Sequence, residues 1–364
     1  MRTLPALDYH DPAVHLAERE AVFGREWLSL GLAEPVSTPG SFVAEVAAGW
    51  PLLVVRDLAG ELRGFHNVCR HRAGPLVDEP TGTRRSLVCR YHGWAYGLDG
   101  ALRSARDSGL SPAELDGLDL LPVRVATWRG LLFACLDAAT PPLENWLGGF
   151  ADACATHPME AWTAGPRCVH PIAANWKAYG DNYLEGYHVP LVHPGLNRAI
   201  DASTYQVDVG DGWARHHARA RDGARTIGTW LWHWPNLALN LYEHGLSVER
   251  WYPTSPTSCE LVLDHAYDLT VPGAEDANRL DVEASDVICL EDKVICEAVQ
   301  RNLSAGAYGV GVLSPRHEQG VADFQARVLA ARAAVAPPVS VGVPVASPPQ
   351  TVAVAGGAAG DGHR

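Results

Sequence analysis

Four metal-ligating side chains stand in two close pairs in the stretch CRHRAGPLVDEPTGTRRSLVCRYHGW, which begins at Cys69 and ends at Trp94. Cys69 and His71 form a C-x-H pair, Cys89 and His92 form a C-x-x-H pair, and seventeen residues separate the pairs. Two thiols and two imidazoles suit a mononuclear zinc site. They also suit a two-iron cluster in which both thiolates bind one iron and both imidazoles bind the other, which raises the reduction potential.

The residues around these pairs favour the cluster. Gly74 and Gly93 allow the backbone to turn closely around a metal, so that backbone N–H groups can point at the sulfurs. Trp94 and Tyr96 would shield a redox centre from water. The whole stretch resembles the Rieske motif, in which the same two pairs are separated by a gap of similar length. The resemblance implies a Rieske [2Fe-2S] cluster, and its ligands would be Cys69, His71, Cys89 and His92.

A second set of ligand types lies in the segment NWKAYGDNYLEGYHVPLVH, which ends at His193. Read as a helix, the segment places Asp181, Glu185 and His188 on one face. In an unbroken helix His193 would point about 140° away from His188. Because Pro190 would end the helix just before itself, the chain can fold back and bring both imidazoles to one metal.

A carboxylate would complete an iron site, because two histidines and one carboxylate leave positions open for O₂ and substrate. Residues 281–303, DVEASDVICLEDKVICEAVQRNL, are expected to form a helix. Asp292 lies on its predicted buried side, where an ionised carboxylate is costly unless a cation partners it. Glu291 lies on the other edge of the same side, so helical phase leaves both as candidates. The predicted buried side also carries Val287, Ile288, Ile295, Ala298 and Val299.

The two ligand sets occur in an order that is typical of a known family. The segment that ends at His193 is similar to the family pattern N-W-K-x₃-D/E-N-x₂-D/E-x-Y-H-x₄-H. The later stretch EDKVICEAVQ is similar to the helix whose aspartate completes the iron site, which favours Asp292 over Glu291. From the N-terminal helix to about Phe324, the chain resembles the catalytic α subunit of a Rieske non-haem iron oxygenase.

This resemblance implies a homotrimer in which the cluster of one subunit lies near the mononuclear iron, Fe(II), of its neighbour. A carboxylate that precedes the first iron histidine by three residues bridges the two centres in this family, and here that position is Glu185. Many aromatic-ring members carry aspartate there, whereas glutamate resembles the carnitine-type monooxygenases. Asn182 and Tyr187, in the same segment, are further candidate catalytic residues. The implied iron ligands are His188, His193 and Asp292.

The resemblance also implies a terminal oxygenase that receives electrons from NAD(P)H through a separate reductase or ferredoxin and uses O₂ to hydroxylate an organic substrate. We expect a quaternary amine of the choline, betaine or carnitine type, which would be hydroxylated or N-demethylated. An aromatic-ring-hydroxylating dioxygenase α subunit is the alternative. From a different class, a Rieske electron carrier without oxygenase activity would need only the cluster-binding part of the chain.

Three tryptophans could shape the substrate pocket. Trp230, Trp232 and Trp234 alternate in the stretch TIGTWLWHWPNLALNLYEHG and share one face if this stretch forms a strand. Three indoles on one surface can line an aromatic pocket or enclose a quaternary ammonium group by cation–π attraction. Such a stripe more often belongs to the core or to a subunit interface, and both interpretations stay open.

The net charge and the composition argue against some classes of binding partner. A formal net charge of -13 over 364 residues argues against a nucleic-acid partner. The N-terminal residues lack an apolar signal-like region and no apolar run reaches membrane-spanning length, so we expect a cytoplasmic protein without a membrane partner. The six cysteines outside the cluster motif are scattered among apolar neighbours and are expected to be reduced core residues.

The expected fold class is α+β, with an all-β Rieske domain and a helix-grip-like catalytic domain that has an antiparallel sheet and flanking helices. An amphipathic helix should run from Pro12 to Trp27. The stretches PLLVVRD and ELRGFHNV predict a hairpin that leads into Cys69, and LLPVRVATW and GLLFACLD predict two later strands. The expected units are an N-terminal helical segment packed on the catalytic domain (1–39), the Rieske domain (40–140), the catalytic domain (141–334) and a disordered tail (335–364).

Overall fold

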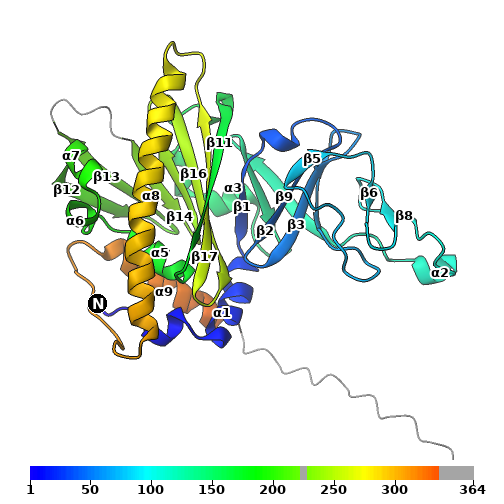
Figure 1. The fold of residues 1–364 in the computed structure, drawn as a ribbon, viewed down its shortest axis with the longest axis horizontal. Helices are drawn as coiled ribbons and strands as arrows, with labels where there is room; N and C mark the ends of the chain where they lie inside the picture. Colours follow the sequence, from blue (N-terminus) through cyan, green and yellow to red (C-terminus); the bar gives the residue numbers. More distant parts are fainter. Residues whose placement is uncertain (222–227, 336–364) are drawn as a thin grey trace, which may run out of the picture. The chain divides into compact units, whose positions relative to one another are not determined.

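Two seven-stranded sheets and the helices around them form most of the described chain in this computed structural model (Figure 1). The structure describes residues 1–221 and 228–335. The α+β class expected from the sequence is confirmed by these sheets and helices. The expectation of a disordered tail at 335–364 lies, apart from Val335, outside the described residues.

The first sheet contains the strands that lead into and out of the first Cys/His loop, which are β4 and β5. Its strand order is β1-β10-β9-β4-β3-β2-β5. The predicted hairpin is present as β3 and β4, with Leu52 opposite His66, and the two later predicted strands pair as β9 and β10. The strands are β1 (Trp27–Leu32), β2 (Ser41–Ala47), β3 (Trp50–Arg56), β4 (Leu62–His66), β5 (Thr81–Thr83), β9 (Pro122–Trp128) and β10 (Leu131–Cys135).

A small three-stranded sheet carries the second Cys/His loop. Its strands are β6 (Leu87–Val88), β7 (Ala95–Tyr96) and β8 (Leu102–Ser104), and the loop joins β6 to β7. The short helix α2 (Pro112–Leu115) follows. The first loop, after β4, is fixed by the Asn67 side chain, whose carbonyl oxygen accepts from the Leu76 backbone N–H at 2.9 Å. Both loops are therefore attached to regular strands.

The N-terminal helix is shorter than the sequence predicts. Helix α1 (Pro12–Glu18) begins after Asp11, whose carboxylate accepts from the Ala13 backbone N–H at 2.6 Å, and it passes into a π-helical turn (Arg19–Phe23). The prediction of a helix as far as Trp27 is wrong, because that residue begins β1, an almost fully buried strand paired with β10. A strand of the first sheet thus lies inside the range assigned to a helical segment.

The second sheet carries the candidate catalytic residues. Its strand order is β11-β17-β16-β15-β14-β13-β12, and every neighbouring pair is antiparallel. The strands are β11 (Thr163–Ile172), β12 (Ile200–Val209), β13 (Trp213–Ala220), β14 (Thr229–His233), β15 (Leu237–Leu241), β16 (Gly245–Ser255) and β17 (Ser258–Tyr267).

Helices pack along this sheet, and the long helix α8 (Ala274–Ser304) runs beside α5 (Trp176–Tyr183) (Figure 1). Buried Glu18 in α1 fastens the N-terminal segment to α5, since its carboxylate accepts from the Trp176 indole at 3.0 Å and from the Lys177 ammonium at 2.6 Å. The other helices are α3 (Leu143–Leu147), α4 (Gly149–Ala153), α6 (Val189–Val192), α7 (Pro194–Ala199) and α9 (Gln319–Ala334), and 3₁₀ turns span Ala6–Tyr9, Glu34–Val36 and Met159–Ala161.

The buried side of α8 differs from the prediction. Val287, Ile295 and Val299, which were expected to be buried, are 53%, 37% and 42% exposed. Apolar residues therefore do not mark the packed face of this helix, which meets α5 and the edge of the second sheet through smaller and more polar side chains. The buried residues of α8 are Ala274, Asn278, Ser285, Cys289, Asp292, Cys296, Gln300 and Leu303.

The two large sheets share their hydrophobic core. One buried cluster joins Leu30 and Leu132 of the first sheet to Trp251 and Leu261 of the second. Hydrogen bonds add to this contact, because the Tyr252 hydroxyl in β16 donates to the Ser29 carbonyl in β1 at 2.9 Å. The cluster-binding loops and the catalytic sheet thus belong to one packed body that spans residues 1–334.

Candidate metal centres

Tight turns shape both Cys/His loops. The Cys69 backbone N–H donates to the Gly74 carbonyl at 2.8 Å, and the Cys89 backbone N–H donates to the Trp94 carbonyl at 2.9 Å. Gly93, in the second loop, has a φ of 74°, a conformation that favours glycine. Each turn therefore brings its cysteine and histidine together at the end of a strand pair.

The sulfurs and the imidazoles of the two loops lie in different surroundings. Cys69 and Cys89 are each only 2% exposed, and the Tyr96 hydroxyl lies 3.4 Å from the Cys69 sulfur. His71 and His92 are exposed, and their ring centroids are 4.5 Å apart. A cluster with one iron bound to the inner thiolates and the other to the outer imidazoles fits this division.

Gly74 leaves room at the cluster sulfurs. A β-carbon at this position would lie 2.8 Å from the Cys89 sulfur, so only glycine fits without a shift. Backbone N–H groups of Tyr91 and His92 donate to the same sulfur. Such bonds stabilise a thiolate and tune the potential of a cluster. The Trp94 indole stacks on the His71 ring with centroids 4.8 Å apart and covers the inner side of the site, as the sequence suggests.

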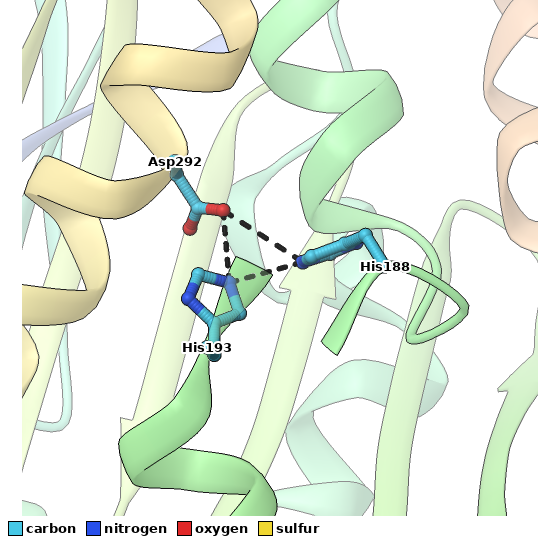
Figure 2. Close-up of side chains that lie close together, drawn as sticks. All are labelled: His188, His193 and Asp292. Atoms are coloured by element: carbon cyan, nitrogen blue, oxygen red, sulfur yellow. Dashed lines mark hydrogen bonds and ion pairs between the residues drawn. The ribbon is translucent and has the colours of Figure 1, made fainter. Parts of the chain in front are cut away.

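The second ligand set meets at one point (Figure 2). The Nε2 atoms of His188 and His193 are 3.1 Å apart, and Oδ1 of Asp292 lies 3.7 Å and 3.0 Å from them. Within residues 1–221 and 228–335, this is the one group of three or more potential ligand residues whose donor atoms lie within 4.8 Å of one another.

The chain reaches this arrangement by a route that differs from the predicted one. Helix α5 ends at Tyr183 and does not continue to Pro190. His188 follows an irregular turn and precedes the short helix α6, in which Pro190 occupies the first turn, and His193 follows α6. Pro190 thus helps to begin a helix between the two histidines, which suits its fixed φ and its missing N–H.

A second layer of side chains holds the three ligands from behind. The Glu185 carboxylate lies 2.5 Å from Nδ1 of His188, and the Glu291 carboxylate lies 2.7 Å from Nδ1 of His193. Asn182 donates from Nδ2 to Oδ1 of Asp292 at 2.7 Å. A carboxylate at Nδ1 fixes the imidazole so that Nε2 faces the metal. Glu291 thus lies behind His193, whereas Asp292 lies beside both Nε2 atoms, in the position that a third ligand would take.

Charge at the site follows from these contacts. Burial of His193 disfavours its charged form, but hydrogen bonds and charge attraction from Asp292 and Glu291 raise its pKa overall. Two imidazoles and one carboxylate, each with an open side toward a cavity, match the donor set of non-haem iron oxygenases. The residues present therefore fit a mononuclear iron ion.

The other candidate residues divide between the site and its surroundings. Tyr187 is 61% exposed, and its ring stacks on His317 away from the three ligands. Trp230 lines the cavity beside the ligands. Trp232 is 1% and Trp234 is 7% exposed, and both belong to the hydrophobic core. The tryptophan stripe thus contributes one wall residue and two core residues.

A cavity of about 350 Å³ opens beside the ligands. Strands β12 to β16, helices α5 to α8, and the turn with Glu185 enclose it. Sequence reasoning missed most of its lining, because facing positions on separate strands become neighbours only once the register is known. In that register His216 lies opposite Trp230, which lies opposite Asn240. The lining residues missed from the sequence include Tyr183, Tyr205, His216, Tyr242 and Glu249.

Similarity to known proteins agrees with both centres. Residues 26–113 match the Rieske [2Fe-2S] domain, and residues 159–221 and 207–333 match the catalytic domain of ring-hydroxylating α subunits. The chain is 31% identical over 337 residues to choline monooxygenase of Atriplex hortensis, an alignment that covers 88% of this chain and 76% of the relative. The chain belongs to the Rieske oxygenase α subunits. The expected [2Fe-2S] cluster, mononuclear iron and electron supply from a reductase are properties of this family, and the enzyme is an oxidoreductase.

This Rieske oxygenase also has bacterial relatives. The carnitine monooxygenase oxygenase subunit of Acinetobacter baumannii is 26% identical over 341 residues, which cover 88% of this chain and 91% of the relative. A solved quaternary ammonium Rieske monooxygenase superposes with a TM-score of 0.82 at 25% identity, over 91% of this chain and 95% of that one. Naphthalene 1,2-dioxygenase from Rhodococcus sp., at 20% identity and a TM-score of 0.75 over 91% of this chain and 94% of that one, shares the fold.

In the described ranges, every helix is too short or too polar to cross a bilayer.

Proposed function

We propose that this chain is the oxygenase component of a two-component monooxygenase that acts on a quaternary amine of the choline, betaine or carnitine type. Its relatives include choline monooxygenases and carnitine monooxygenase oxygenase subunits. The observation that carries the proposal is the chemistry of the cavity beside the iron ligands. That cavity is aromatic and acidic.

The aromatic part of the cavity favours a cation. Trp230 comes from β14, Tyr205 from β12, and the two rings stack with centroids 6.4 Å apart. Tyr183 and Tyr242 line the same space. Faces of such rings attract a quaternary ammonium group by cation–π interaction, worth about 0.5–2 kcal/mol per contact. No lysine or arginine belongs to the lining within the described ranges, so a cationic substrate meets no like charge there.

We assign the iron site to His188, His193 and Asp292. When bound, the cluster supplies electrons one at a time and the ferrous iron supplies the position at which O₂ is activated. Glu185 and Glu291 orient the two imidazoles, and Asn182 holds one Asp292 oxygen in place. The cavity wall positions the substrate carbon beside this site and excludes water from it.

The trimer and the inter-subunit electron route remain part of this proposal. Glu185 lines the iron cavity and also a second cavity of about 410 Å³, whose rim carries Asp181 and Glu318. The exposed imidazoles His71 and His92 suit an acidic docking site on another copy of the chain. Glu185 would then join a partner imidazole to His188. A cytoplasmic location is also part of the proposal, although the plant relatives are named as chloroplastic.

The test is single turnover, because it needs no identified reductase. Anaerobically reduced protein is mixed with O₂ and one candidate substrate, and the hydroxylated product or released formaldehyde is quantified. We expect product from at least one of choline, betaine and carnitine, and none from the variant His188→Ala. Product from naphthalene or another aromatic hydrocarbon, with none from the quaternary amines, would overturn the proposal.

A further inference from the structure

One carboxylate in the iron cavity has no metal ligand to support. Glu249 lies in β16, is 5% exposed and lines the cavity. Its Oε1 accepts from Nδ2 of Asn240 at 2.5 Å, and its Oε2 accepts from the Tyr179 hydroxyl at 3.4 Å, which is a long contact. The carboxylate is therefore oriented by neutral donors and is incompletely satisfied at one oxygen.

Within residues 1–221 and 228–335, no lysine or arginine lines the cavity beside this carboxylate. In the described part of the chain, none of the ion pairs includes Glu249. The titratable groups that face it are neutral or acidic, and they are Tyr179, Tyr183, Tyr242, Cys289 and Asp292. Burial and the nearby Asp292 charge raise the pKa of Glu249 to about 7, despite the hydrogen bonds from Asn240 and Tyr179. A buried carboxylate in such surroundings is stabilised by a cation that enters from the cavity.

The sheet register places this carboxylate next to the aromatic wall. Trp230 in β14 lies opposite Asn240 in β15, and Asn240 lies opposite Ser247 in β16. Glu249 follows Ser247 by two residues and so projects from the same face of the sheet. The indole, the amide and the carboxylate form a continuous surface on the floor of the cavity.

Three other acids line the cavity, Glu185, Asp281 and Asp292. Glu185 contacts His188, and Asp292 lies beside the two imidazoles of the iron site. A substrate carboxylate would meet these acids and Glu249, while the described lining offers it no lysine or arginine. Residues 222–227, which precede Gly228 of the lining, lie outside this description. The charge pattern favours a substrate whose only charge is positive.

We propose that Glu249 binds the cationic nitrogen of the substrate and selects a quaternary ammonium compound that has no carboxylate of its own, such as an ammonium alcohol. This inference rests on the proposed function, because it names the residue that recognises the amine. Glu249 acts here as a specificity-determining residue. Its carboxylate forms the ion pair, and the surrounding rings contact the methyl groups.

The test compares choline with its uncharged carbon analogue, in which a quaternary carbon replaces the nitrogen. The two molecules have the same shape, so their affinities differ mainly by the charge. The variant is Glu249→Gln, which keeps the size and the hydrogen-bonding capacity toward Asn240 and Tyr179. The matched control is Ser247→Ala, which removes a hydrogen bond to Asn240 on the same face of the sheet and leaves the Glu249 carboxylate in place. Cluster spectrum and iron content verify that each variant is folded and loaded.

We expect Glu249→Gln to raise the KM for choline about tenfold or more, with kcat changed much less. The inhibition constant of the uncharged analogue should stay within about twofold, and Ser247→Ala should shift both constants by less than about twofold. The preference for choline over carnitine should also shrink in Glu249→Gln, because the repulsion of the carnitine carboxylate is reduced.

The wild-type KM for choline should rise as the pH falls through about 7, since protonation of Glu249 removes its charge. This dependence should be absent in Glu249→Gln. An unchanged choline KM in the variant, or an equal loss of choline and analogue binding, would overturn the role of Glu249 and leave the proposed function intact. If the wild-type protein converts no quaternary amine at all, the proposed function fails, and this inference fails with it.

Discussion

At the scale of single residues, each imidazole of the iron site has a carboxylate behind it. His188 contacts Glu185, and His193 contacts Glu291, each through Nδ1. The Asp292 carboxylate lies on the other side of the imidazoles, with one oxygen next to both Nε2 atoms. Glu291 and Asp292 are adjacent in α8, but they contact different nitrogen atoms of His193. Their spacing in the helix alone does not show this difference.

A pair of variants distinguishes these two acids. Asp292→Ala should empty the mononuclear iron site, because it removes one of three ligands. Glu291→Gln should retain that iron and lower its affinity or the activity by about 10- to 100-fold, as expected when a residue behind a ligand is changed. The iron content per chain and the affinity for added Fe(II) measure both outcomes. Loss of the iron in Glu291→Gln with retention in Asp292→Ala would reverse the assignment.

Glu185 should matter for electron transfer more than for iron binding. Glu185→Gln keeps the length of the side chain and can still contact His188, but it removes the charge. We expect both metal centres to stay loaded and the rate of cluster reoxidation by O₂, in the presence of substrate, to fall by about 10- to 100-fold. Stopped-flow absorption of the cluster gives this rate. A variant that loses its mononuclear iron but reoxidises at the normal rate would contradict the bridging role.

The sequence located the candidate ligand residues that the structure brings together, but it did not locate most of the residues around them. Cys-x-His and Cys-x-x-His pairs can be recognised from the spacing of neighbouring residues, without knowledge of the tertiary structure. Glu249 and His216 come from different strands and show no local pattern. Tyr187 lies within the histidine segment and was expected at the site, but it follows Glu185 in the turn and points to His317.

At the scale of elements, the irregular turn between α5 and α6 sets the position of Glu185 and His188. The sequence predicted a continuous helix here because Asp181, Glu185 and His188 have helical spacing. In the structure, Asp181 turns the other way and accepts from the Tyr9 hydroxyl at 2.5 Å. Tertiary contacts thus override a short periodic pattern. The prediction of an apolar buried face on α8 was wrong for a related reason. The residues that this helix packs against its neighbours are mostly small or polar.

This turn has little space to spare. A β-carbon at Gly186 would lie 2.3 Å from the Tyr205 ring. We expect Gly186→Ala to displace the turn, to lower the mononuclear iron content and to cost about 1–3 kcal/mol of stability. Gly195→Ala in α7 is the matched control, because nothing lies within 4 Å of the added carbon. Iron analysis and thermal unfolding report both effects, and equal behaviour of the two variants would argue against a tightly packed turn.

At the scale of the whole molecule, a buried charge network ties the two large sheets together. Arg250 in β16 donates to Glu45 in β2 at 2.9 Å and to Asp264 in β17 at 2.6 Å. Its side chain is fully buried. The two neighbouring carboxylates outweigh burial and raise the pKa of the guanidinium above its ordinary value. This network thus links the catalytic sheet to the sheet that carries the first Cys/His loop.

Removing this arginine should weaken the whole protein. Arg250→Met leaves Glu45 and Asp264 buried with less compensation, which we expect to cost about 3–5 kcal/mol. Arg215→Met removes an exposed ion pair with Asp208 and should cost about 1 kcal/mol or less. Urea unfolding under anaerobic conditions compares the midpoints of the two variants. Similar midpoints would show that the network adds nothing beyond a surface ion pair.

The central claim is that one chain carries both a Rieske cluster and a separate iron site. It is tested most directly by the iron and acid-labile sulfide content of anaerobically purified protein, measured for the wild type and for His188→Ala. We predict about three irons and about two sulfides per wild-type chain, and about two of each in the variant, with an unchanged cluster spectrum. Equal iron in both proteins, or iron without sulfide in the wild type, would contradict this account.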